Sequence, residues 1–229
     1  MKVLDGMLAD FDSTINKADE VVKNIRIENF SEFKENGIPT SKEEFWKYTD
    51  PSIVKDSEFS LGASSEINDD GFDIVIVNGK LVKKIEHIQN TNVQNGLSIK
   101  LLENNYFDKT KNPFINLNNA FLTDGCVINF EKESEEEISI LNIVNNVNSE
   151  QIIHPRIIIK AGKNSNITIL EEVRFLGEMK NLVNSVTNFY LEEGANVEHV
   201  MIDDYSKNTY QISNILVKQK KDSNFSSYN

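Results

Sequence analysis

The chain has 229 residues, with 24 basic and 36 acidic side chains and a formal net charge of −12. This charge argues against nucleic-acid binding, which needs a basic face to neutralise phosphates. The single cysteine, Cys126, excludes an internal disulfide framework and any cysteine-built zinc or iron–sulfur site made by this chain alone. Because no apolar run reaches the length of a membrane span and the N-terminus does not resemble a signal peptide, we expect a cytoplasmic protein with no membrane partner.

Residues 1–70 are predicted to form a small helical region. They hold 16 acidic and 8 basic side chains, which is most of the net negative charge of the chain. Apolar residues from Ile15 to Phe33 recur at helical spacing, and Gly37 with the proline two residues later predicts the end of this helix. The small, polar stretch 62–71 predicts the boundary with the next region.

A second, short helix is predicted within the same region. Thr40 or Ser41 can cap its N-terminus, because a hydroxyl can accept a hydrogen bond from a free amide of the first turn. Phe45, Trp46 and Tyr48 lie inside this helix. We expect these three side chains to form a small aromatic core that docks the N-terminal helices.

Residues 71–124 are predicted to be a mixed α/β connecting segment. Apolar residues recur at 72–82 around Asn78-Gly79, a dipeptide typical of tight hairpin turns. Further along, Asn112 followed by a proline predicts the start of a short helix with one apolar side.

Residues 125–229 are predicted to consist of β-strands. Gly125, Gly162, Gly194 and Asp222 each follow one strand and precede another, at separations of 37, 32 and 28 residues. A loose period near 30 in an all-β region predicts a solenoid, and a right-handed parallel β-helix, a single-stranded solenoid, is the main candidate. A β-sandwich is the alternative. The runs rich in β-branched residues are 138–144, 157–159, 167–170, 186–191, 197–202 and 212–217.

The three histidines are candidate ligands, and each also has an ordinary structural interpretation. His154 precedes a proline and is expected to be a turn residue that caps a rung, with a ligand role as the alternative. His199 alternates with Val197 and Met201, so these three share one strand face. There it either lines a polar channel inside the β-helix or is packed and hydrogen-bonded. His87 lies in a weakly patterned stretch and is expected to be exposed.

The remaining reactive residues have structural interpretations as well. Cys126 leads into an apolar run, so we expect a small buried thiol rather than a sulfur carrier. Glu171 and Glu172 are neighbours on a predicted strand and face opposite sides, so they cannot form an acid–base pair; one of them is expected to point inward and to need a partner. The acidic run 131–137 is expected to be a solvated loop, with docking of a basic partner as the alternative.

Several motifs resemble, in order, those of the SufD family. Residues 36–50, Asn-Gly-Ile-Pro-Thr-Ser-Lys-Glu-Glu-Phe-Trp-Lys-Tyr-Thr-Asp, are similar to its N-terminal signature, and the WKYT element points to SufD rather than to its paralogue SufB. Residues 112–125 are similar to a second segment, which opens with Asn-Pro-Phe and closes with Asp-Gly. The resemblance covers residues 25–229. Further matching positions are His154-Pro-Arg156, Gly162 with Ser165, Glu171-Glu172, Asn184 with Thr187, Gly194-Ala195 with Glu198-His199, and Asp222-Ser223 with Phe225.

The resemblance implies a fold and a role. The fold is an N-terminal helical region followed by a right-handed β-helix core. The role is that of a non-catalytic scaffold subunit in a SufB–SufC–SufD-type complex that assembles iron–sulfur clusters. ATP hydrolysis falls to the SufC subunit, in keeping with the lack of a glycine-rich phosphate loop in this chain. The resemblance assigns no catalytic or metal-binding residue to this chain. The cofactors it implies are an iron–sulfur cluster and, as an open second candidate, a flavin, and both belong to the complex.

The resemblance also implies how the chain ends. Family members are considerably longer, so we expect residues 125–229 to be a truncated β-helix core. Contacts with a SufB-like subunit and a SufC-like ATPase are then expected in a C-terminal half beyond residue 229. Within the chain, the N-terminal helices could cap one end of the solenoid, while the last rung is expected to expose unpaired backbone groups.

A function of a different class is a carbohydrate-active β-helix protein such as a polysaccharide lyase. Such proteins cluster acidic and Arg or Lys residues on one outer face, whereas this chain has only three arginines, Arg26, Arg156 and Arg174. The absence of a recognisable secretion signal also counts against this class. A β-rich binding module is the remaining alternative.

Overall fold

The computed structural model describes residues 7, 10–12, 15, 20–57, 59–62, 67, 71–84, 91–95, 110–122, 124–145, 149–204 and 207–229. None of the helices described is both long and apolar enough to cross a membrane. The helices are α2 (Glu20–Asn36), η1 (Glu44–Trp46), η2 (Pro51–Asp56) and α4 (Pro113–Ala120). The strands are β1 (Ser60–Leu61), β2 (Ile74–Val77), β3 (Lys80–Lys84), β4 (Thr91–Asn95), β5 (Cys126–Phe130), β6 (Glu135–Asn145), β7 (Gln151–Ile153), β8 (Arg156–Ala161), β9 (Asn166–Leu176), β10 (Asn181–Leu191), β11 (Asn196–Asp203), β12 (Thr209–Gln219) and β13 (Asn224–Tyr228).

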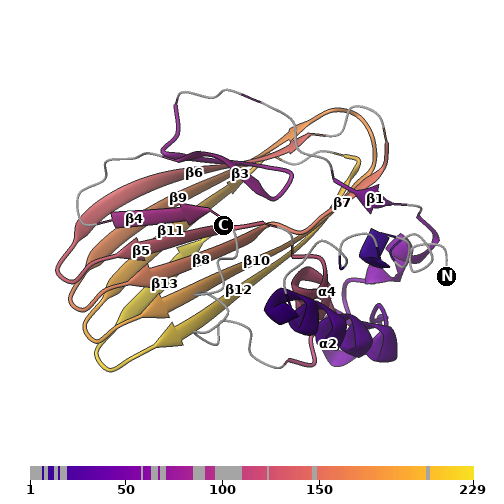
Figure 1. Ribbon diagram of the computed structural model, residues 1–229, viewed down its shortest axis with the longest axis horizontal. Helices are drawn as coiled ribbons and strands as arrows, with labels where there is room; N and C mark the ends of the chain where they lie inside the picture. The colour runs from indigo at the N-terminus through magenta and orange to yellow at the C-terminus, as the bar shows by residue number, and fades with distance from the viewer. Residues whose placement is uncertain are drawn as a thin grey trace.

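The strands from β5 onward form a two-sheet solenoid of about three turns (Figure 1). In the first sheet, β5, β8, β10 and β12 stack in parallel. In the second sheet, β6, β9, β11 and β13 do the same. Each rung crosses from the first sheet to the second through a tight turn and then returns to the next strand of the first sheet. This arrangement confirms the predicted mainly β fold with a parallel β-helix, and it differs from the antiparallel sheets of a sandwich.

The turn between the two sheets occupies the same place in each rung. Glu135, Asn166, Asn196 and Asn224 are register partners on successive strands, 31, 30 and 28 residues apart. Two residues before each of them lies a residue with a left-handed backbone, at φ angles between 57° and 71°. These four residues are Glu133, Asn164, Gly194 and Asp222. Asn, Asp and Gly adopt this conformation with little strain, which explains their recurrence at the turn.

The prediction that Gly125 is the first turn of the series is wrong. Gly125 lies just before β5, where an added Cβ would come within 2.9 Å of the Arg156 carbonyl oxygen. The first turn instead contains Glu133, which has a left-handed backbone. Glutamate is not a residue type that favours this conformation, so the sequence does not reveal the turn. The acidic run 131–137 is therefore only partly a loop, because β6 begins at Glu135.

Apolar side chains fill the solenoid interior on the side of these turns. Ile128, Ile159 and Phe189 are register partners on successive strands of the first sheet, and Ile138 and Ile169 are partners in the second. All five belong to one buried cluster. Since burying one such side chain contributes about 1.5–3 kcal/mol, the stacked rungs stabilise one another mainly through this cluster.

The two ends of the solenoid differ. At the first end, β2 pairs in parallel with β6, and the antiparallel strands β3 and β4 cover the edges of the two sheets. At the other end, β12 and β13 have only half-buried or exposed residues. The prediction that the N-terminal helices cap one end is wrong, because strands cover it. The hairpin at Asn78-Gly79 is confirmed, with positive φ at both residues.

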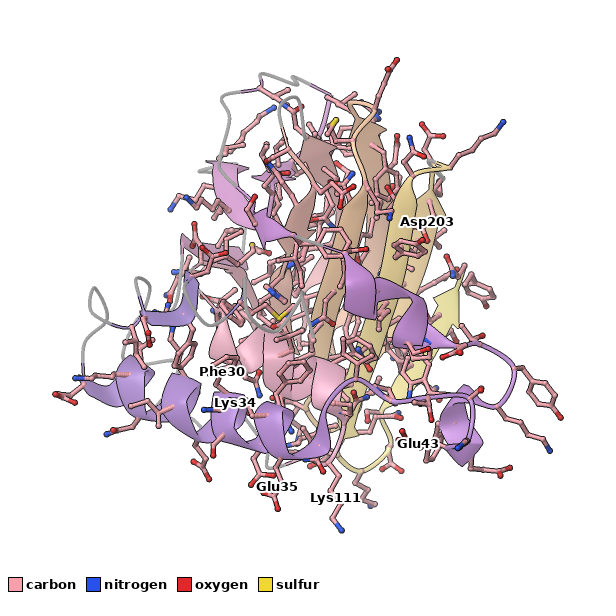
Figure 2. All side chains as sticks on the ribbon, turned by 90° about the vertical axis from the view of Figure 1, so that its right-hand side faces the viewer. Phe30, Lys34, Glu35, Glu43, Lys111 and Asp203 are labelled. Atoms are coloured by element: carbon pink, nitrogen blue, oxygen red, sulfur yellow. The ribbon has the colours of Figure 1, made fainter. Side chains whose placement is uncertain are left out.

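The helices pack against the side of the solenoid (Figure 1). Phe30 and Phe33 of α2, Phe114 of α4 and Leu182 of β10 share a second buried cluster. In Figure 2, Phe30 and Lys34 are labelled on α2, and the Lys34 ammonium lies 5.1 Å from the centre of the Phe30 ring. The predicted start of α4 is confirmed, since the Asn112 side chain accepts hydrogen bonds from the first free amides of the helix.

The predicted aromatic core around Trp46 is wrong. Phe45 and Tyr48 are 98% and 92% exposed, and Trp46 alone packs, with its ring centre 5.2 Å from that of Phe114. The segment forms a three-residue 3₁₀ turn rather than an α-helix. Neighbouring side chains of such a turn point about 120° apart, so Phe45 points away from the core when Trp46 faces it.

Candidate functional site

Four polar side chains form a connected chain that runs from the solenoid interior to the exposed Ser227 on the last strand, which we call the interior polar chain. Asn142 Nδ2 donates a hydrogen bond to Glu171 Oε1 at 2.6 Å, and Glu171 Oε2 lies 3.0 Å from His199 Nε2. His199 Nδ1 in turn lies 3.1 Å from the hydroxyl oxygen of Ser227. Asn142, Glu171 and His199 are buried, so these bonds replace the water that the polar groups give up on folding.

The strand register brings these residues together. The register partner of Glu171 is Ile140, and that of His199 in the preceding rung is Ile169, so the first two contacts run diagonally between rungs. His199 and Ser227 are direct register partners. Their sequence separations of 29, 28 and 28 residues are close to the length of a rung. Sequence reasoning missed Asn142 and Ser227. A correctly placed turn series would have put both on the same strand face as Glu171 and His199.

The predictions for the strand residues Glu171, Glu172 and His199 are confirmed. Glu171 points inward and has partners, whereas Glu172 points outward and pairs with Arg174 at 2.5 Å. His199 is fully buried, hydrogen-bonded, and packed with its ring centre 5.2 Å from that of Phe189. The structure therefore favours the packed, hydrogen-bonded role for His199.

The interior polar chain has a small cavity beside it. This cavity has a volume of about 20 Å³ and is lined among others by Asn142, Glu171, Ser185 and Gln211. This is room for one water molecule, and Asn142 Oδ1 has no other hydrogen-bond partner among the described residues. Within the part of the chain that the structure describes, no three His, Cys, Asp or Glu side chains come close enough to bind a metal ion together.

A second buried polar network, the polar seam, joins α4 to the solenoid. It consists of Asn118, Asn119, His154, Arg156 and Asn184. Arg156 donates from Nη1 to the side-chain oxygens of Asn118 at 3.1 Å and Asn119 at 2.9 Å. Asn118 Nδ2 donates to the main-chain oxygens of Pro155 at 2.9 Å and Asn184 at 2.8 Å. Burial lowers the pKa of Arg156 to about 10, so it stays charged at neutral pH.

His154 lies in this seam, between β7 and β8, as predicted for a residue at a turn. Its ring stacks on Phe121, with 5.3 Å between the ring centres, and its Nδ1 lies 3.2 Å from Asn184 Nδ2. Burial lowers the pKa of His154 to about 3, so its imidazole is neutral at neutral pH. A role for His154 as a ligand stays a prediction.

Cys126 is buried, as predicted, at the start of β5. Burial and the nearby Asp124 carboxylate raise the pKa of its thiol to about 12. Because the thiolate is the reactive form, this thiol is inert at neutral pH. The prediction for His87 falls outside the described residues.

Comparison with known families finds a match within the solenoid part of the chain. Residues 143–229 match a family model described as SUF system FeS cluster assembly, SufBD core domain. The matched range runs from Ile143 in β6 to the end of the chain and contains both Glu171 and His199. No curated protein matches the chain significantly. The matched part of the chain is therefore similar to the SufBD core domain, which suggests involvement in iron–sulfur cluster assembly by the SUF system.

Proposed function

We propose that the chain acts as a SufD-type, non-catalytic scaffold subunit of a SufB–SufC–SufD-type complex in the cytoplasm. The match of residues 143–229 to the SufBD core domain carries this proposal. The choice of SufD over SufB rests on the WKYT element at residues 46–49. The partners are a SufB-like subunit and a SufC-like ATPase. The iron–sulfur cluster, and a flavin where one is used, is bound by the assembled complex and not by this chain alone.

The mechanical character of the solenoid supports a scaffold role. β6 pairs with β9, and β10 with β12, over eleven residues each. Each rung contacts only its neighbours, so such ladders give an elongated support with little internal freedom. A support of this kind can hold two partner subunits at a fixed separation.

The residues of the 112–125 motif have structural tasks, which fits a non-catalytic role. Asn112 caps α4, Asn118 ties α4 to the solenoid, and the Asp124 carboxylate accepts a hydrogen bond from the Gly125 amide at 2.8 Å. These contacts use the polar atoms of the motif for architecture. We assign no catalytic residue to the chain.

The proposal is tested by purifying the protein from its own cells with an affinity tag placed at the chromosomal locus. We expect a SufB-like and a SufC-like subunit to co-purify in stoichiometric amounts, and a reciprocal tag on the SufC-like subunit to recover this protein. Recovery of the folded protein without either subunit, in both directions, would contradict the proposal.

A further inference from the structure

A stripe of apolar side chains lies on the outer face of the second sheet, the face that points away from the solenoid interior. Because side chains alternate along a strand, Val200 points outward where its neighbour His199 points inward. Leu170, Val200 and Tyr228 are register partners on β9, β11 and β13. Ile202 follows Val200 on the same face of β11. We call these four residues the outer stripe.

The outer stripe is open to solvent. Ile202 and Tyr228 are 49% and 56% exposed, and the other two members are half-buried. None of the four belongs to a buried cluster formed by the described residues. At the first end of the solenoid, the chain covers this face itself, since the Ser139 hydroxyl, next to Leu170 in the register, donates to Asp73 Oδ2 at 2.7 Å. A contiguous exposed apolar surface of this kind is typical of an interaction site.

A row of carboxylates runs beside the outer stripe. Glu137, Thr168 and Glu198 are register partners, two residues before the row that contains Leu170 and Val200, which places them about 6.6 Å away along the strands. Both glutamates are exposed, and neither pairs with a described residue. Within the described strands of the second sheet from β6 onward, the only Lys or Arg is Arg174, and it pairs with Glu172. The face therefore attracts a basic partner and repels a second copy of this acidic chain.

The spacing of the rungs fits an α-helix laid across the strands. Neighbouring rungs are about 4.8 Å apart, and one turn of an α-helix rises about 5.4 Å, so about one turn lies on each rung. A helix with apolar residues at i, i+3, i+4 and i+7 has one apolar face, and a lysine or arginine at its edge can reach the neighbouring row. We propose that the outer stripe docks a basic amphipathic α-helix of a partner protein, whose cationic side chains pair with Glu137 and Glu198.

The test is a fluorescence-anisotropy titration in which the full chain is added to a labelled model peptide. The peptide has about 18 residues, enough for helix formation, with leucines at the spacing i, i+3, i+4 and i+7 and lysines along one edge. We expect saturable binding that weakens as the salt concentration rises. Ile202→Ser should weaken binding about tenfold because an apolar contact is lost. Glu198→Lys should weaken it about fivefold because attraction becomes repulsion.

Matched controls separate this surface from the general properties of the chain. Ile27→Ser changes an isoleucine of α2 that is 47% exposed, close to the exposure of Ile202. Glu32→Lys makes the same change of charge at an exposed position of α2. Both control variants should keep the affinity of the wild-type protein. All four positions are exposed, so the substitutions should leave the fold intact, and urea unfolding of each variant checks this.

Four outcomes would overturn the proposal. They are no saturable binding, equal affinity for a peptide of the same composition with its leucines scattered around the helix, equal losses in a variant and its matched control, and a dimer of the chain that Ile202→Ser abolishes. The last outcome, seen by sedimentation equilibrium, would assign the outer stripe to a second copy. The titration uses the chain without SufB-like or SufC-like subunits, so its result is independent of the proposed scaffold function.

Discussion

The polar seam joins its elements through main-chain oxygens as well as side chains, whereas the interior polar chain uses side chains. In the seam, Asn118 and Asn184 donate to main-chain oxygens of another element. In the interior polar chain, Asn142, Glu171 and His199 bond to side chains of the neighbouring rung. The seam thus joins a helix to a solenoid through backbone positions, whereas the interior chain joins successive rungs of one solenoid.

The two networks also depend on different parts of the sequence. The helical half of the seam comes from the contiguous segment 112–125, and its function depends on α4 forming locally. The interior polar chain has one residue per rung and exists only when the strands are in register. Substitutions in the seam should therefore loosen the helices, and substitutions in the interior chain should weaken the contact between rungs.

The largest effect is expected from Asn118→Ala in the seam. This change removes two hydrogen bonds to main-chain oxygens and one partner of the buried Arg156 guanidinium, so we expect the free energy of unfolding to fall by about 3 kcal/mol. Asn116→Ala is the matched control, because Asn116 lies on the same helix and its amide donates to the nearby Thr110 oxygen rather than to the solenoid. It should lose about 1 kcal/mol. Equal losses in urea titrations of the two variants would show that Asn118 does not join helix and solenoid.

A smaller effect is expected from the pH dependence of His154. Its pKa is about 3 in the folded protein and near 6.5 in the unfolded chain. Between these values only the unfolded state binds the proton, so this residue lowers stability as the pH falls below 6.5, by about 1.4 kcal/mol per pH unit. His154→Phe removes this contribution. Between pH 7.5 and 5, its stability relative to the wild-type protein should therefore rise by about 2 kcal/mol.

Thermal or urea unfolding of both proteins at several pH values measures this difference, and the carboxylates that they share cancel in the comparison. A difference in the free energy of unfolding between the two proteins that stays constant across the whole pH range would contradict a neutral His154 in the seam.

Sequence patterns predicted the elements that depend on local chemistry. Asn78-Gly79 specified the hairpin, Asn112 specified the start of α4, and runs of β-branched residues specified the strands of the solenoid. The rung turn was misplaced because Glu133 holds the left-handed position where glycine was expected. Burial of Phe45 and Tyr48 was wrongly predicted because their apolar character does not show which side of a 3₁₀ turn faces the core.

The candidate sites were predicted only in part for a related reason. The inward orientation of one of the Glu171-Glu172 pair follows from strand alternation alone, and it was predicted correctly. Its partners Asn142 and His199 depend on the register between strands 28 to 29 residues apart. A one-residue error in that register reverses the face of every side chain, so the partners follow only from the three-dimensional structure.

The central claim is that the solenoid brings residues one rung apart into direct contact. A double-mutant cycle of Glu171→Gln and His199→Gln, read from urea unfolding, tests it most directly. We predict a coupling free energy of about 1 kcal/mol, because the two side chains are hydrogen-bonded at 3.0 Å. The control cycle pairs Glu171→Gln with His154→Phe, which lies in the seam, and should be additive within about 0.5 kcal/mol. Additivity between Glu171 and His199 would contradict the rung register and, with it, the interior polar chain.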